Sequence, residues 1–191
     1  MASGNRGKLR EIERLLADLE VTVMPQSELG VDDAEETGET FEANALIKAR
    51  HAAAVTGLPA IADDSGLAVD ALGGRPGVYS ARYSGPGATD DSNIDKLLVE
   101  LDGVPDAERG AAFHCVACFV EPGNDDALLA HGSWRGRIAQ QRQGDGGFGY
   151  DPVFIDTELG VAAAELSSEE KNRRSHRGQA LAELVSLLQS R

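Results

Sequence analysis

Hydrophobic residues recur at helical spacing in four segments of the chain. Residues three or four positions apart lie on one helix face, and these series predict helices over about 9–19, 41–55, 90–101 and from 175 onward. Thr40, Thr89 and Ser167 precede helical stretches, where a hydroxyl side chain caps backbone N–H groups. Ser167 with Glu170 predicts a capping box for a further short helix, whose basic residues are Lys171, Arg173 and Arg174.

Shorter apolar runs predict strands between these helices. The predicted strands cover residues 21–24, 59–62, 67–69, 112–120, 127–131, 134 onward and 153–155. We expect the run 59–62 to stop on two adjacent acids and Gly66 to separate it from 67–69. No linker, repeat or low-complexity tract interrupts the chain, so the sequence predicts one domain over residues 1–191.

The charge balance limits the possible partners. The chain has 191 residues, a hydrophobic fraction of 41% and a formal net charge of -14. A nucleic-acid polymer needs a basic footprint, so it is not an expected partner, whereas a small polyphosphate needs only a few focused cations and a divalent ion. No apolar run approaches the ~18 residues of a membrane span and no secretory signal is visible, so the cytoplasm is the expected location.

The two cysteines, Cys115 and Cys118, lie within the predicted strand 112–120. Positions three apart in a strand point to opposite faces, so the thiols are expected to diverge. A redox pair or zinc site is therefore not expected, and both are predicted to be core or edge residues.

Asp63 and Asp64 stand at the end of the predicted strand 59–62 and are followed by Ser65 and Gly66. Two adjacent carboxylates are costly to bury without a cation. Taken alone, the stretch is compatible with an exposed turn, because Asp, Ser and Gly favour turns, or with a group of metal ligands.

Other segments offer complementary chemistry. The polar loop before the first predicted helix presents backbone N–H groups and a lysine to an anion; its residues are Ser3, Gly4, Asn5, Arg6, Gly7 and Lys8. Lys48 and the segment 171–177 add cations, and Glu35 and Glu36 add acids. The glycine-rich segment 144–152 brings Phe148 for stacking on a flat ligand. Together these groups indicate a magnesium-dependent enzyme acting on a nucleoside polyphosphate.

The ordered set of motifs resembles the inosine/xanthosine triphosphate pyrophosphatases and spans nearly the whole chain. The matching stretches are 3–8, Glu35-Glu36-Thr37-Gly38, 41–49, Ala62-Asp63-Asp64-Ser65-Gly66-Leu67, 76–83, Gly146-Gly147-Phe148-Gly149-Tyr150-Asp151-Pro152 and Ser175-His176-Arg177-Gly178. The resemblance implies an α/β fold with an elongated mixed β-sheet flanked by helices, two lobes with a central cleft, and a homodimer. It implies hydrolysis of ITP, dITP and XTP to the monophosphate and pyrophosphate.

The resemblance also implies roles for individual residues. Asp64 and Lys8 are the expected catalytic residues, with Asp64 as proton acceptor. Mg²⁺ would be held by Glu35 and Asp64, with Glu36 and Asp63 in support. The residues implied in substrate binding are Ser3, Gly4, Asn5, Arg6, Gly7, Lys8, Lys48, Ser65, Phe148, Gly149, Tyr150, Asp151, Lys171, His176 and Arg177. Phe148 would stack on the base, and His176 and Arg177 would read the 6-oxo edge of the purine.

Two departures and two alternatives accompany this resemblance. The family's first strand is not visible before Ser3, so the phosphate loop is expected to be less well supported, and Ala43 replaces a glutamate usual in the helix motif. One alternative is a septum-inhibitor-type pyrophosphatase that acts on modified pyrimidine nucleotides. The other is a nucleotide-binding regulator that does not hydrolyse its ligand, although Lys8, Asp63 and Asp64 argue against it.

Overall fold

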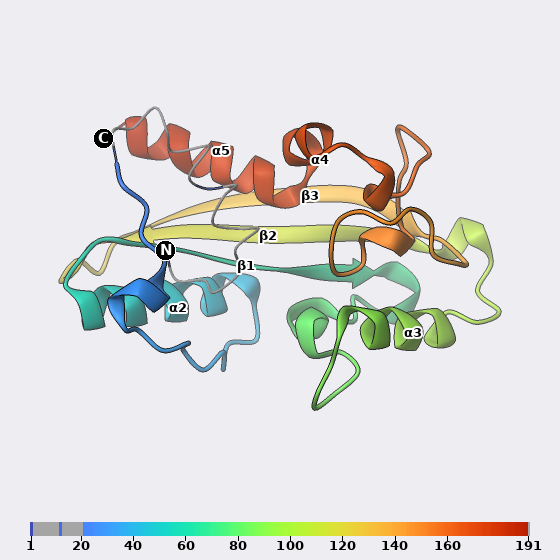
Figure 1. The fold of residues 1–191 in the computed structure, drawn as a ribbon, viewed down its shortest axis with the longest axis horizontal. Helices are drawn as coiled ribbons and strands as arrows, with labels where there is room; N and C mark the ends of the chain where they lie inside the picture. The colour runs from blue at the N-terminus through green and yellow to red at the C-terminus, as the bar shows by residue number, and fades with distance from the viewer. Residues whose placement is uncertain (2–11, 13–20, 191) are drawn as a thin grey trace. The chain divides into compact units, whose positions relative to one another are not determined.

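The computed structural model describes Met1, Ile12 and residues 21–190 (Figure 1). The phosphate loop at 3–8 and the helix predicted over 9–19 lie outside the described residues, Ile12 excepted. The described helices are α2 (Phe41–Thr56), α3 (Asp90–Glu100), α4 (Ser168–Arg174) and α5 (His176–Gln189). The strands are β1 (Ala60–Val69), β2 (Gly110–Val120), β3 (Ala127–Ile138) and β4 (Phe154–Asp156). None of the described helices is long and apolar enough to cross a membrane.

The four strands form one sheet in the order β1-β2-β3-β4. β2 and β3 are neighbours joined by the turn 121–126, so they run antiparallel. β3 and β4 are also antiparallel, with Gly136 opposite Asp156 and Ile138 opposite Phe154. These pairings are antiparallel, whereas the resemblance implied a mixed sheet. The runs 127–131 and 134 onward form one continuous strand, β3.

The chain divides into two compact units, each built from segments that are far apart in the sequence. Unit 1 comprises 1–64, 115–132 and 176–191, and unit 2 comprises 65–114 and 133–175. In unit 1, α2 and α5 contact opposite faces of the sheet. The α2 face includes Val116 and Cys118, and the α5 face includes Cys115 and Ala117. Alternating side chains of β2 therefore enter two different hydrophobic clusters.

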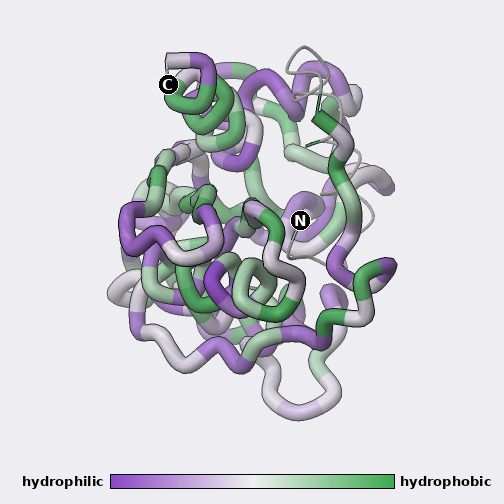
Figure 2. The backbone as a smooth tube through the Cα atoms, turned by 90° about the vertical axis from the view of Figure 1, so that its left-hand side faces the viewer, coloured by the Kyte–Doolittle hydropathy of each residue, from purple (hydrophilic) through white to green (hydrophobic). Residues whose placement is uncertain are grey.

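The cysteines confirm this alternation. Cys115 and Cys118 are both buried and unbridged, and they lie in the α5 and α2 clusters respectively. The Cys118 thiol donates to the Ala45 carbonyl of α2 at 3.2 Å, and burial raises the pKa of Cys118 to about 12. On α5, Leu181 and Leu184 face the sheet, and Figure 2 shows hydrophobic residues alternating with polar ones along this C-terminal helix.

In unit 2, α3 packs on an aromatic core. The Phe113 ring lies 4.6 Å from that of Phe154, and the Trp134 ring lies 5.1 Å from Phe154, between centroids. Ile94 and Leu97 of α3 join the same cluster. The predicted apolar face of α3 is therefore confirmed at these positions.

The predicted capping residues also stand at the N-termini of their helices. The Thr40 hydroxyl accepts from the Ala43 N–H at 3.1 Å, and Thr89 forms a full capping box with Ser92. Ser167 accepts from the Glu170 N–H. The carboxylate of Glu170 pairs with arginines of its own helix, Arg173 and Arg174, so the reciprocal half of the predicted box at Ser167 is wrong.

Two strand predictions are wrong. β1 continues without interruption from Ala60 to Val69 through Asp63 and Gly66, because its pairing in the sheet overrides the turn preference of Asp-Asp-Ser-Gly. Residues 21–24 form no strand. There the Met24 carbonyl accepts from the amino group of Met1 at 2.9 Å instead.

Asp156 at the end of β4 provides a test of the unit 2 core. Its carboxylate accepts from Trp134 Nε1 at 2.9 Å and from the N–H groups of Glu158 and Leu159 at 2.7 and 3.0 Å. Burial alone would raise the pKa of Asp156, but these donors hold it below its ordinary value.

We expect Asp156→Ala to lower the free energy of unfolding by about 3 kcal/mol, because buried donors lose their acceptor. Urea denaturation measures the change. Since the folded pKa is lowered, the stabilisation by Asp156 is present above the unfolded pKa and is lost as pH falls through the folded one. Asp126→Ala, at an exposed turn, is the control and should change stability by less than about 0.5 kcal/mol. Equal losses in the two variants would contradict the role of Asp156.

Candidate functional site

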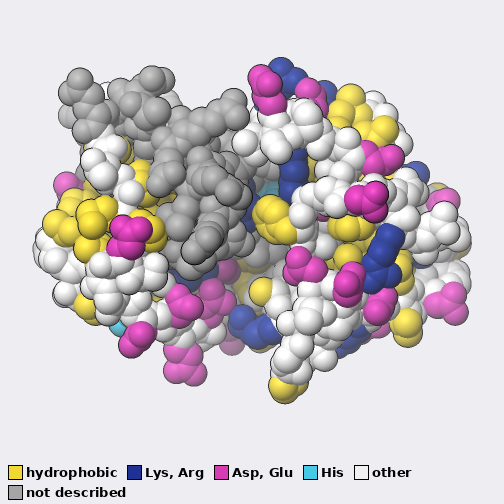
Figure 3. All heavy atoms as spheres, in the orientation of Figure 1, with side chains coloured by type: hydrophobic (Ala, Val, Ile, Leu, Met, Phe, Trp, Pro, Cys, Tyr) yellow, Lys and Arg dark blue, Asp and Glu magenta, His cyan; other side chains and the backbone are white. Residues whose placement is uncertain are grey.

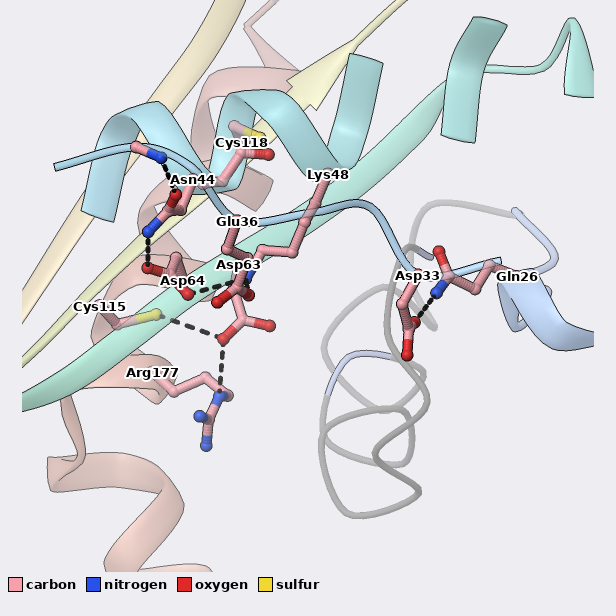
Figure 4. A network of polar contacts seen from close by, with 12 residues as sticks. Gln26, Asp33, Glu36, Asn44, Lys48, Asp63, Asp64, Cys115, Cys118 and Arg177 are labelled. Carbon is pink, nitrogen blue, oxygen red and sulfur yellow. Dashed lines mark hydrogen bonds and ion pairs between the residues drawn. The ribbon is translucent and has the colours of Figure 1, made fainter. Parts of the chain in front are cut away.

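A lysine joins two carboxylates in unit 1 (Figure 4). Lys48 Nζ on α2 lies 2.7 Å from Asp64 Oδ1 and 2.8 Å from Glu36 Oε1. Asn44, one helical turn earlier, donates to Asp64 Oδ2 at 3.4 Å and accepts from the Gly38 N–H at 2.8 Å. The four-residue spacing of Asn44 and Lys48 puts both side chains on one helix face. This face therefore holds β1 and the acidic segment around Glu36 together.

Burial and charge act against each other in this cluster. Burial raises the pKa of Asp64 above its ordinary value, and Lys48 only partly opposes the shift. Burial alone would lower the pKa of Lys48, but Asp64 and Glu36 raise it. Lys48 is therefore a persistent cation between two carboxylates that would otherwise repel each other.

The oxygen donors of this cluster fit a magnesium ion. Among the described residues, no three acidic, histidine or cysteine side chains are arranged to hold a metal by themselves. Mg²⁺ in phosphate-processing sites is commonly held by one or two carboxylates, and substrate phosphates and water complete its shell. Asp64 and Glu36 converge on one nitrogen within 2.8 Å, so they provide such a partial donor set. Glu35 is exposed on the same segment.

Asp63 points away from this cluster. Its Oδ2 lies 3.3 Å from Arg177 Nε at the start of α5, and the Cys115 thiol of β2 approaches the same oxygen at 3.9 Å. The side chains of Asp63 and Arg177 are 0% and 5% exposed. The structure thus separates the two adjacent acids: Asp64 faces α2, and Asp63 faces α5 (Figure 4).

In unit 2, one carboxylate organises the glycine-rich loop. Asp151 is buried, and its Oδ2 accepts from the Phe148 N–H at 2.8 Å and from Lys171. Lys171 Nζ also lies 4.3 Å from the centre of the Phe148 ring. Phe148 is 47% exposed. Asp151 and Lys171 therefore fix an aromatic ring that has an accessible surface, as a stacking platform requires.

Two further contacts hold this loop. The Gly149 N–H donates to Asp90 Oδ2 at 2.7 Å, and the Tyr150 hydroxyl donates to the Ser80 carbonyl at 2.8 Å. Burial raises the pKa of Tyr150, so the phenol stays protonated as a donor. The backbone around the ring is thus fixed from both sides.

The remaining predicted residues fall into three groups. Ser3, Gly4, Asn5, Arg6, Gly7 and Lys8 lie outside the described residues. His176 is buried beside Arg177 at the start of α5. Ser65 is half-buried on β1, in unit 2.

The sequence interpretation omitted three residues that hold the site together. Asn44 precedes Lys48 by four residues, and this spacing alone indicates that the two side chains share a helix face. The contact of Asp90 with the Gly149 N–H has no local signal in the sequence. Ser80 contributes a carbonyl to Tyr150, which no side-chain pattern could indicate.

The matches to known proteins extend over the entire sequence. A model of the Ham1 family matches residues 1–187. The chain belongs to the Ham1 family. It is 58% identical over 191 residues to the dITP/XTP pyrophosphatase of Pectobacterium atrosepticum, and the matched region is 100% of this chain and 97% of that protein. The dITP/XTP pyrophosphatase of Yersinia pestis is 60% identical over 182 residues, 95% of this chain and 92% of that protein.

Solved structures share the Ham1 fold. A HAM1 protein from Coxiella burnetii superimposes with a TM-score of 0.94 at 52% identity, covering 99% of this chain and 96% of that one. The Ham1 protein of Staphylococcus aureus gives 0.90 at 41% identity over the same shares of the two chains. The resemblance inferred from the motifs is confirmed at the level of the family and its α/β fold.

Lys48 allows a test of the candidate metal site of this Ham1 protein without an activity assay. We expect Lys48→Met to lower the free energy of unfolding by about 2 kcal/mol, because Asp64 and Glu36 lose their shared cation in a partly exposed cluster. Millimolar magnesium should then raise the melting temperature of the variant more than that of the wild type. Arg50→Met, on the exposed side of α2, is the control for loss of a positive charge; a similar magnesium response in both variants would contradict the assignment.

Two glycines of the loop form a matched pair. Gly147 and Gly149 both have positive φ, 76° and 59°. A Cβ at Gly147 would lie 2.1 Å from Asp151 Oδ2, whereas a Cβ at Gly149 would have nothing within 4 Å. We expect Gly149→Ala to cost about 1 kcal/mol of unfolding free energy from backbone strain, and Gly147→Ala about 3 kcal/mol, because it also displaces Asp151. Urea denaturation measures both losses of unfolding free energy. Equal losses in the two variants would show that Asp151 does not organise the loop.

Proposed function

We propose that this chain hydrolyses non-standard purine nucleoside triphosphates, ITP, dITP and XTP, to the monophosphate and pyrophosphate. The observation that carries the proposal is the similarity over the full chain to the dITP/XTP pyrophosphatase of Pectobacterium atrosepticum. The two clusters described above are consistent with it, since one offers paired carboxylates with a lysine and the other a fixed aromatic ring.

Hydrolysis of a polyphosphate depends mainly on charge neutralisation and positioning. In this proposal Asp64 and Glu36 hold magnesium, with Glu35 adjacent to them. The metal supplies positive charge to the phosphate oxygens. Asp64 orients the attacking water and accepts its proton, and Lys48 moves from the carboxylates toward a phosphate. Ser3–Lys8 bind the rest of the triphosphate, with Lys8 as a second catalytic cation.

The base would be recognised by two further sets of residues. Phe148 stacks on the purine, and Gly149, Tyr150, Asp151 and Lys171 keep the loop in position or contact the nucleotide. His176 and Arg177 donate to the 6-oxo group, and Ser65 contacts the substrate. A 6-amino group would leave these donors unsatisfied, and mismatches of that kind discriminate strongly. Adenine nucleotides should therefore be poor substrates.

We further propose that the active form is a homodimer in the cytoplasm. Size-exclusion chromatography with light scattering tests the dimer directly.

The acidic composition supports a small nucleotide rather than a nucleic-acid polymer as substrate. On the face shown in Figure 3, Lys and Arg side chains lie dispersed among Asp and Glu side chains rather than in one basic area.

Pyrophosphate release from ITP, XTP, dTTP and ATP with magnesium tests this function. We expect ITP and XTP to be hydrolysed at least about a hundredfold more efficiently than ATP, because a site built for a 6-oxo group rejects the analogue lacking it. Preferential hydrolysis of dTTP, the pyrimidine substrate of this set, would favour the septum-inhibitor-type activity, and binding without hydrolysis would favour the regulator.

Asp64→Asn is the matched active-site control. It keeps the size of the side chain and its contact with Asn44 but removes the charge and the proton acceptor. We expect kcat to fall by about a thousandfold. Undiminished turnover would refute the role of Asp64, although it would leave the substrate preference intact.

A further inference from the structure

Adjacent side chains of a strand point to opposite faces, and β1 is continuous through Asp63 and Asp64. On the even positions, Ala60 and Ala62 pack in the α2 cluster, and Asp64 contacts Lys48 of α2. On the odd positions, Ile61 packs against the α5 cluster. Asp63 therefore belongs by register to the α5 face.

The contact between Asp63 and α5 is buried and specific. The Asp63 side chain is 0% exposed, and its Oδ2 lies 3.3 Å from Arg177 Nε. Arg177 is the second residue of α5, so its backbone is fixed by the helix. Figure 4 shows that the two terminal nitrogens of the guanidinium point away from Asp63. Because the guanidinium is planar, a contact through Nε also fixes the orientation of its two terminal nitrogens.

We infer that Asp63 is a positioning residue for Arg177, and through it for discrimination of the purine 6-oxo group, rather than a magnesium ligand. The inference rests on the proposed function. Arg177 supplies donors to an oxygen acceptor on the base, and Asp63 holds the guanidinium so that these donors keep one orientation. The two adjacent acids thus serve different halves of the substrate, Asp64 the phosphates and Asp63 the base.

The alternatives make different predictions. A metal ligand at Asp63 would affect turnover and the magnesium requirement. A purely structural ion pair would affect stability and would reduce the rates with all nucleotides to the same degree. A positioning residue would change the preference between 6-oxo and 6-amino purines and would do so only while Arg177 is present.

The test is a double-mutant cycle with Asp63→Asn and Arg177→Gln. The ratio of kcat/KM for ITP to that for ATP is measured for the wild type, both single variants and the double variant. We expect Asp63→Asn to lower the ratio about tenfold, mainly through a higher KM for ITP. In the Arg177→Gln background the same substitution should change the ratio less than about twofold. The magnesium concentration for half-maximal rate should be unchanged.

Two further variants keep the test decisive if Asp63→Asn is unstable. Arg177→Lys preserves the positive charge but has no Nε and no planar fork. It should lower the ITP/ATP ratio as Asp63→Asn does. Cys118→Ala removes a buried side chain from the other face of β2 and controls for loss of packing. It should lower the melting temperature and leave the ratio unchanged.

Several outcomes would overturn the inference. These are equal losses with ITP and ATP in Asp63→Asn, independent losses that multiply in the double variant, a raised magnesium requirement, and an unchanged ratio in Arg177→Lys. If the wild type itself does not prefer ITP to ATP, the proposed function fails. If the wild type discriminates and Asp63→Asn does so equally well, only the role of Asp63 fails.

Discussion

The alternation of side chains along β1 is the constraint on which the unit 1 site depends. Because Asp63 and Asp64 are consecutive in a continuous strand, their carboxylates enter opposite faces of the sheet. Each then meets a cation from a different helix, Arg177 of α5 or Lys48 of α2. Two buried carboxylates on one face would repel each other at considerable cost. The strand avoids that repulsion and connects the site to both helices.

These pairings reconcile the acidic composition with the buried charges. The formal charge of the chain is -14, yet Asp63, Asp64, Asp151 and Asp156 are each paired with or close to a lysine or arginine. Removing one partner from such a pair leaves an uncompensated charge, which is much more destabilising than the pair is stabilising. Four of the described cations, Lys48, Lys171, Arg174 and Arg177, are therefore positioned where a carboxylate is buried.

Local signals in the sequence account for most helices but not for β1. The caps at Thr40 and Thr89 and the shared face of Asn44 and Lys48 depend on contacts within a few residues, and the structure has them. The interruption of the strand expected at Asp63–Gly66 does not occur, because sheet pairing and the cations of α2 and α5 act over long sequence separations. The strand expected at 21–24 fails for the converse reason, since β propensity without a sheet neighbour is insufficient. The metal-ligand roles of Glu35, Glu36, Asp63 and Asp64 were implied by the resemblance, and a set of matching motifs carries no information about the sheet face that each side chain enters.

The two clusters also differ in how they are prepared for a ligand. The backbone around Phe148 is fixed before any ligand binds, by buried Asp151, by the carboxylate of Asp90 and by the Ser80 carbonyl. This order lowers the entropic cost of stacking. At Asp64 the cation already present is a lysine on a flexible stem. A divalent ion that binds there must displace an ammonium group, so metal binding is coupled to a new partner for Lys48. Under the proposed function, a phosphate oxygen would satisfy both requirements at once, since it would complete the magnesium shell and accept the released lysine. The metal and the polyphosphate should therefore bind cooperatively, whereas the aromatic loop needs no such rearrangement.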